Sequence, residues 1–163
     1  MVREYLFLLA EDKLLRAEIR AATMRMHPDR FKRLTPVIGV GETAAAHFLA
    51  ELFSPERVNR PEEVTSYLGL APVVSQSGSS PVRAKLRPVG QKRLRGILVE
   101  AAWQWTWRDP EAKSICNHHF AKHGIGQKAI AAVARKLAIK LWRMTVEIPP
   151  LPAGGATCGA RSG

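Results

Sequence analysis

A run of serines stands directly before the most basic stretch of the chain. Residues 75–80 read Ser-Gln-Ser-Gly-Ser-Ser, and six cations follow within thirteen residues. These cations are Arg83, Lys85, Arg87, Lys92, Arg93 and Arg95. A serine hydroxyl beside a bound phosphate can attack phosphorus if a base activates it and positive groups stabilise the charge. The pattern indicates phosphodiester chemistry, but spacing identifies no activating base, and composition alone describes only a flexible loop.

The basic stretch is not balanced by acids, because no Asp or Glu lies between Glu63 and Glu100. If its six cations contact phosphates, log K falls with log salt at a slope of about −5. The 163 residues hold 25 Lys and Arg against 14 Asp and Glu, a formal net charge of +11. Such a balance favours nucleic acid as a partner, with a solvated basic face as the alternative.

Two further groups extend or compete with this interpretation. Lys136, Lys140 and Arg143 share one face of a predicted helix and could enlarge the electropositive surface. Trp103 and Trp107 are one helical turn apart and could stack bases, although packing in the core or at a protein interface is favoured.

A cluster of possible metal ligands follows, formed by Cys116, His118, His119 and His123. The spacing is poor for a structural zinc site and no second cysteine pair accompanies it. We therefore predict no metal site in this chain.

The turn Gly39-Val40-Gly41 resembles the hairpin of a helix-hairpin-helix DNA-binding motif. Glycines allow positive φ and a close approach of backbone to phosphate, and free amides begin the next helix. Glu42 at that helix start is unfavourable for a phosphate, and a simple tight turn is the alternative.

Apolar periodicity indicates a mainly α fold. It predicts an N-terminal connector helix over residues 2–26 that ends before Pro28, a helix-hairpin-helix-like unit, a loop or extended basic segment, and then a helical bundle. Within this order, helices are expected at 61–68, at 91–108, from Pro110 to about His123, and from there to about Glu147.

The connector helix carries an apolar stripe that includes Leu8, Leu15 and Ile19. That stripe either forms a coiled coil or interdomain connection, or packs on the domain behind it.

We divide the chain into three parts: a connector over 1–30, a domain over 31–147 with the hairpin segment 34–53, and a tail over 148–163 that is expected to be disordered. Cys116 and Cys158 are too far apart in sequence and context to suggest a disulfide framework. With no predicted signal or membrane segment, we expect a cytoplasmic, nucleoid-associated protein.

Taken in order, several motifs resemble the C-terminal transposase domain of the IS-one-ten (IS110) family, which includes pilin-gene-inverting recombinases. The resemblance covers about residues 5–146. The markers are Leu34-x-x-Val37-Ile38-Gly39-Val40-Gly41 with 44–52, Tyr67-Leu68-Gly69-Leu70-Ala71-Pro72, Gln76-Ser77-Gly78, Gly90-x-x-x-Leu94-Arg95, Ala101-Ala102 and residues 132–137. Two positions depart from the family's usual pattern, at Ile38 before the hairpin and at Arg87-Pro88-Val89-Gly90.

The resemblance implies that Ser77 is the nucleophile, with Ser75 as the alternative. It also implies a RuvC-like domain whose four acids bind Mg²⁺, a structured bridge RNA that pairs with DNA, and self-association or pairing with an intact transposase through the connector. This sequence contains no RuvC-like segment, so we expect a DNA-binding part that does not cut DNA alone. A free-standing helix-hairpin-helix nucleic-acid-binding module without catalysis is the competing hypothesis.

Overall fold

The computed structural model describes residues 1–52, 58–73, 85–86 and 91–147. Over these ranges the fold is mainly α, as predicted, with seven helices and one small antiparallel sheet. The helices are α1 (Val2–Met26), α2 (Pro28–Leu34), α3 (Glu42–Leu52), α4 (Pro61–Tyr67), α5 (Lys92–Arg108), α6 (Pro110–His123) and α7 (Gly126–Val146). The strands are β1 (Pro72–Val73) and β2 (Lys85–Leu86).

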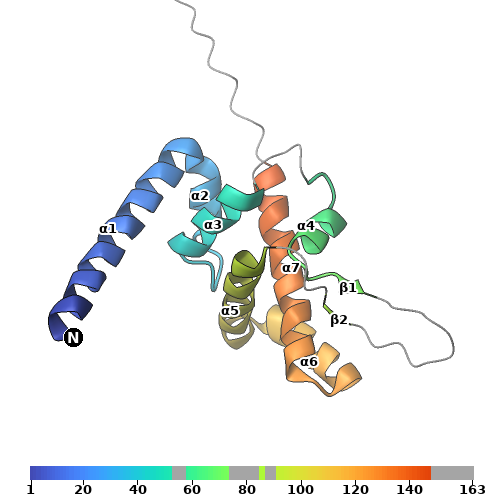
Figure 1. The fold of residues 1–163 in the computed structure, drawn as a ribbon. Coiled ribbons are helices and arrows are strands. Elements are labelled where there is room, and N and C mark those ends of the chain that lie inside the picture. Colours follow the sequence, from blue (N-terminus) through green and yellow to red (C-terminus); the bar gives the residue numbers. More distant parts are fainter. Residues whose placement is uncertain (53–57, 74–84, 87–90, 148–163) are drawn as a thin grey trace, which may run out of the picture.

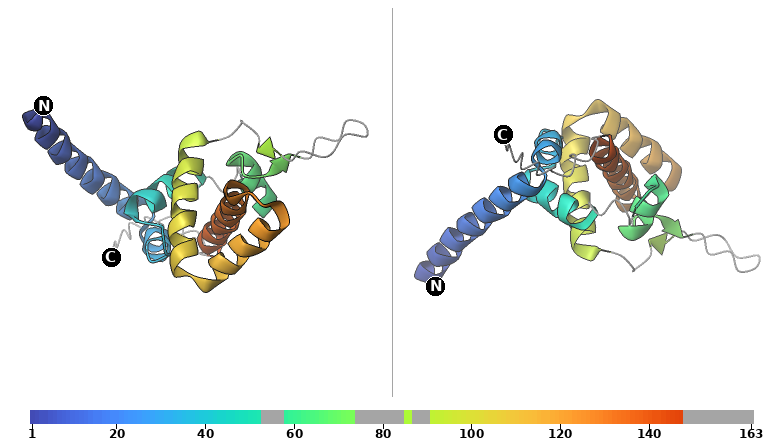
Figure 2. Two further views of the ribbon diagram at one scale, coloured as in Figure 1. Left: turned by 90° about the horizontal axis from the view of Figure 1, so that it is seen from below. Right: turned by 90° about the horizontal axis from the view of Figure 1, so that it is seen from above.

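Helix α7 is the centre of the fold. Its buried residues recur at helical spacing, so that one face is apolar along its whole length. These residues include Ala129, Ile130, Val133, Ala134, Leu137, Ala138 and Leu141. Helices α2, α4, α5 and α6 all contact α7, and Figure 2 shows it seen nearly along its axis among α4, α5 and α6.

The α5–α6–α7 bundle is set by two short connections with clear local causes. Asp109 caps α6, where its side chain accepts hydrogen bonds from the amides of Glu111 at 2.8 Å and Ala112 at 3.4 Å. A hydrogen bond from the Trp105 side chain, followed by these amides, lowers the pKa of Asp109. Gly124 ends α6 with φ of 64°, a left-handed conformation that glycine adopts without strain.

Helix α2 was not expected from the sequence. The apolar spacing predicts only that the first helix ends before Pro28, but proline also suits the first position of a new helix. Phe31 and Leu34 on α2 are buried in the core. The Arg30 guanidinium donates a hydrogen bond of 3.1 Å from Nε to the carbonyl oxygen of Thr145, which joins α2 to the end of α7.

Helix α1 extends away from the bundle, with the N-terminus at its free end (Figure 1). It contacts α2 and α3 near its C-terminal end, and Thr23 is its one buried residue. The predicted stripe is exposed: Leu8 by 63%, Leu15 by 54% and Ile19 by 42%. The interpretation that this stripe packs on the domain is therefore wrong for these three residues. The coiled-coil or interdomain interpretation stays a prediction.

The turn between α2 and α3 is held against α5 by a close backbone contact. Gly39 has φ of 84°, and a Cβ atom added there would lie 2.3 Å from the carbonyl oxygen of Ala101. Nothing lies within 4 Å of a Cβ added at Gly41. The close approach that Gly39 allows is therefore to α5.

We expect Gly39→Ala to lower the free energy of unfolding by about 2 kcal/mol or more, because it adds both a left-handed strain and an overlap with α5. Gly41→Ala is the matched control and should change the free energy of unfolding by less than about 1 kcal/mol. Urea denaturation of both variants measures the difference. Equal stability of the two variants would contradict the proposed role of the Gly39 contact.

Candidate nucleic-acid interface

The start of α3 borders an open groove between α1, α3 and α5. The groove has a volume of about 660 Å³, and its lining includes Gly39, Gly41, Thr43, Gly96 and Gln104. The residues at the start of α3 thus line an open groove and are not buried in the core. This is the arrangement that the hairpin hypothesis requires, because an anion must reach the start of the helix.

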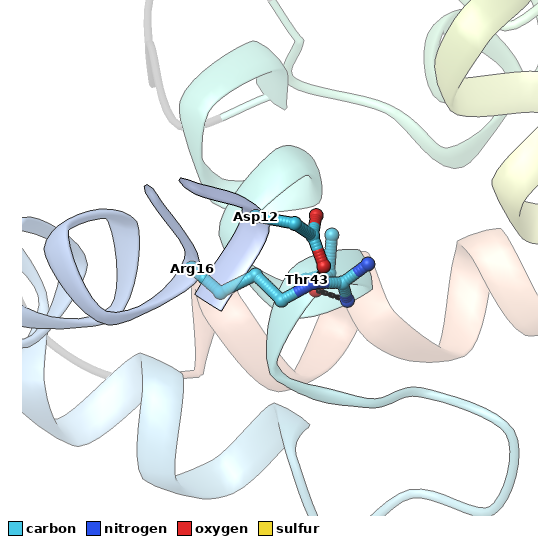
Figure 3. Close-up of polar contacts among 3 residues, drawn as sticks. All are labelled: Asp12, Arg16 and Thr43. Atoms are coloured by element: carbon cyan, nitrogen blue, oxygen red, sulfur yellow. Dashed lines mark hydrogen bonds and ion pairs between the residues drawn. The ribbon is translucent and has the colours of Figure 1, made fainter. Parts of the chain in front are cut away.

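Two arginines of α1, Arg16 and Arg20, line this groove, and no sequence motif identifies them. The Arg16 Nε atom is 2.7 Å from the Asp12 carboxylate, and its Nη1 atom donates a 3.3 Å hydrogen bond to the Thr43 hydroxyl (Figure 3). The Asp12 hydrogen bond is the main cause that raises the pKa of Arg16. Arg20 lies 3.3 Å from the carboxylate of Glu42.

These contacts alter the expected effect of Glu42 on phosphate binding. By itself, its carboxylate is unfavourable for a phosphate at the start of α3. In the structure Arg20 pairs with that carboxylate, and Arg16 reaches the next residue, Thr43. The ion pairs Arg16–Asp12 and Arg20–Glu42 are both exposed, so they contribute little to stability and weaken as the salt concentration rises.

The segment with the serine run starts and ends at the small sheet. Val73 pairs with Lys85 and Pro72 pairs with Leu86, in antiparallel register. The backbone amides of Leu70 and Ala71 both donate to the carbonyl oxygen of Thr65, which fixes the approach to β1. Ser75, Ser77, Arg83 and Arg87 lie outside the described residues.

The start of α5 is held by a hydrogen-bond network around Tyr67. The Tyr67 hydroxyl donates to the Glu51 carboxylate at 3.1 Å and accepts from the Gln91 side chain at 3.3 Å. The Gln91 amide also donates to the Tyr67 carbonyl oxygen at 3.2 Å. Helices α3, α4 and α5 therefore meet where the predicted serine and basic segments join the bundle.

The first turn of α5 presents positive charge at the positive end of a helix dipole. Lys92 and Arg93 are exposed and Arg95 is half-buried, while the first turn holds no acidic residue. Cations are unfavourable at this end of a helix, whereas an anion is favourable there. The positive charge of this turn is therefore unfavourable in the absence of a ligand and would be stabilised by a bound phosphate.

The cations of α7 lie elsewhere. Lys140 is exposed, and its Nζ atom is 4.8 Å from the centre of the Trp105 ring. Trp105 is about 20 Å along α5 from Lys92, at about 1.5 Å per residue. Lys136 and Lys140 therefore do not join the first turn of α5 in one small patch.

The possible metal ligands on α6 are only partly brought together. The rings of His119 and His123 stack with centroids 6.3 Å apart, and His118 meets His119 edge-on at 5.5 Å. Cys116 is half-buried and packs on the core. Over the described ranges, no group of three or more His, Cys, Asp or Glu side chains is arranged to hold a metal ion.

Trp103 and Trp107 lie on the surface of α5, with 42% and 78% of their areas exposed. Of the favoured pair of interpretations, packing in the core is wrong, and Trp105 takes the buried position on this helix at 2% exposure. Base stacking and a protein interface remain the two open interpretations.

Comparison with known proteins finds one family and two relatives. The family model described as Transposase IS116/IS110/IS902 matches residues 31–117. Two proteins of Sinorhizobium fredii (strain NBRC 101917 / NGR234), y4rJ and y4qE, are described as transposases and are each 36% identical, over 110 and 72 residues. These regions cover 64% and 44% of this chain. They span only 28% and 18% of the two relatives.

The unequal burial of the tryptophans predicts unequal effects of substitution. Trp105→Ala should lower the free energy of unfolding by about 3–5 kcal/mol, because it leaves a cavity in the core. Trp107→Ala should cost less than about 1 kcal/mol, since most of that ring is already in solvent. Chemical denaturation of the two variants makes the comparison, and a large loss in Trp107→Ala would contradict the exposed position of that ring.

Proposed function

Because the chain belongs to the IS116/IS110/IS902 family of transposases, we propose that it is the part of such an enzyme that holds DNA and carries the serine nucleophile. The reaction served would be DNA transposition or site-specific recombination. The first turn of α5 is the observation that carries this proposal.

Three features of that turn support DNA binding. Lys92 and Arg93 are exposed to solvent, and no acid lies between Glu63 and Glu100 in the sequence. The Tyr67 network fixes where the turn begins. Two neighbouring exposed cations on a helix whose start is held in place are suited to contact a DNA backbone.

The groove at α3 supports a second point of contact with the same DNA. The exposed position of Gly41 leaves the α3 amides accessible, and Arg16 and Arg20 lie on its border. A phosphate there would compete with Asp12 and Glu42 for the two guanidiniums. We propose that this hairpin binds backbone without reading sequence.

We propose Ser77 as the nucleophile. It belongs to the segment between Val73 and Lys85, which pair with each other in the small sheet. The start of α5 lies only a few residues beyond this pair. The family resemblance, rather than any described contact, assigns the role to Ser77 instead of Ser75.

Mg²⁺ is expected in the complete enzyme, where it would polarise the scissile phosphate. The described residues do not fit such a site. Of the described residues, only two acids, Glu42 and Glu100, line the groove, and Glu42 is paired with Arg20. No group of three potential ligands occurs in the described ranges. We derive no step through the metal from this chain.

The proposed partners are DNA, a structured bridge RNA, and a second chain or intact transposase along the exposed stripe of α1. No described helix is long and apolar enough to cross a membrane. We propose a location with the nucleoid, since DNA is the substrate of the family's reaction.

Charge reversal tests the DNA-binding surface. Lys92→Glu with Arg93→Glu should weaken binding to a short duplex by more than about tenfold and reduce the slope of log K against log salt by about 2. Arg3→Glu with Lys13→Glu, on the exposed N-terminal part of α1, makes the same change in net charge and is the control. Fluorescence anisotropy over a salt series gives both quantities, and equal losses in the two double variants would contradict a localised site.

Substitution of the serines tests the catalytic assignment. In a complete transposase that carries this domain, Ser77→Ala should abolish strand cleavage while DNA affinity stays within about twofold, because a hydroxyl contributes to chemistry far more than to backbone binding. Ser75→Ala is the matched control and should cleave. Cleavage that survives Ser77→Ala would contradict the assignment, and cleavage that survives both variants would favour a binding module without catalysis.

A further inference from the structure

Over residues 112–146, helices α6 and α7 carry charged residues of positive sign only. These residues are not part of the DNA-binding surface proposed at the first turn of α5. Residues 112–146 contain no Asp or Glu, and the structure describes all of them. They contain three histidines, at 118, 119 and 123, and seven Lys or Arg residues. The seven are Lys113, Lys122, Lys128, Arg135, Lys136, Lys140 and Arg143.

Part of this charge converges on one place, which we call the histidine patch: His118, His119, Lys122, His123 and Lys136. The three imidazoles are in ring contact. Lys122 from α6 and Lys136 from α7 act electrostatically on His119. His119 is half-buried and the other four residues are exposed, so the patch is open to a ligand.

These surroundings lower the pKa of His119. Burial is the largest cause that lowers its pKa, followed by the positive charges of His118, His123, Lys122 and Lys136. Among the described residues, α5, the other helix packed on α6, adds no charged group that acts on His119. No carboxylate offsets the repulsion.

This environment favours an anion over a metal ion. A divalent cation at the stacked pair would face Lys122 and Lys136, whereas metal sites normally supply carboxylate or thiolate charge. A phosphate would instead accept hydrogen bonds from the lysines and from protonated imidazoles. The repulsion that lowers the pKa of His119 would then be relieved.

We propose that the histidine patch is a second nucleic-acid site, which binds the phosphodiester backbone and takes up a proton as it binds. The inference rests on the proposed DNA-binding function but concerns a different place on the molecule. Lys136 is one turn from Lys140, which lies over Trp105. The patch is thus associated with the C-terminal end of α5 rather than with Lys92 and Arg93.

Proton uptake fixes the direction of the pH dependence. In the free chain the pKa of His119 lies below its ordinary value. A bound phosphate favours the charged imidazole and raises that pKa. Affinity must therefore increase as the pH falls through the pKa of the bound state and stay low above it.

The test compares binding of the whole chain to a short duplex at about pH 6 and about pH 8, on either side of the ordinary histidine pKa of about 6.5. Ionic strength is held constant, and fluorescence anisotropy reports the affinity. A rise of half to one unit in the pKa of His119 tightens binding by up to about three- to tenfold, a limit approached as the pH falls below the pKa of the free chain. His119→Gln with His123→Gln should remove this dependence.

His47→Gln is the matched control, because His47 lies on α3 and bonds to Thr43 outside the patch. It should keep the pH dependence of the wild type. Lys122→Gln with Lys136→Gln should weaken binding at both pH values. Thermal unfolding of each variant establishes that the fold is retained.

Direct titration of the His119 ring by NMR gives an independent readout, in which its pKa should rise when DNA is added. An unchanged pKa, or a pH dependence that survives His119→Gln with His123→Gln, overturns the histidine patch while leaving DNA binding at α5 intact. Absence of DNA binding at both pH values overturns the proposed function itself.

Discussion

Burial of the apolar face of α7 is the constraint on which the rest of the structure depends. Ala129, Val133, Ala134, Leu137 and Leu141 of α7 are fully buried, and α2, α4, α5 and α6 all contact this helix. Each fully buried leucine contributes about 1.5–3 kcal/mol. Because α2, α4, α5 and α6 share this one surface, the packing of α7 sets the positions of the first turn of α5 and of the histidine patch.

The same packing explains why positive charge gathers in separate places. An apolar face turned inward leaves the opposite face of each helix for Lys and Arg, and acids are missing from long stretches of the sequence. Lys92 and Arg93 are thereby placed at one end of α5, and Lys140 lies near the other end, over Trp105. A polyanion that contacts both ends must follow the bundle for about 20 Å, the scale of several base pairs of DNA.

Helix α1 differs from the bundle in how it is held. Apart from Thr23 and the half-buried Met24 near its C-terminal end, it meets α3 through exposed contacts of Arg16 and Arg20. Such contacts are weak and screened by salt. The groove at α3 therefore depends on interactions of a few tenths of a kcal/mol to about 1 kcal/mol each, and a strong anionic ligand could rearrange them.

The sequence by itself determined the elements and the family motifs. Apolar spacing located α1, α5, α6 and α7 to within a residue or two, and prolines and glycines marked their ends, because these signals are local. The mainly α fold and the family resemblance are confirmed. The assignment of Ser77 and of the DNA-contacting cations stays a prediction.

Only the tertiary structure decided which faces meet. Periodicity placed Trp105 on the apolar face of α5, apart from Trp103 and Trp107. It cannot tell that Gly39 contacts Ala101 or that Arg20 pairs with Glu42. Each of these facts depends on contacts between residues far apart in the chain or on the orientation of a whole helix. Local sequence preferences carry no information about such contacts, because they are selected by the close packing of the complete core.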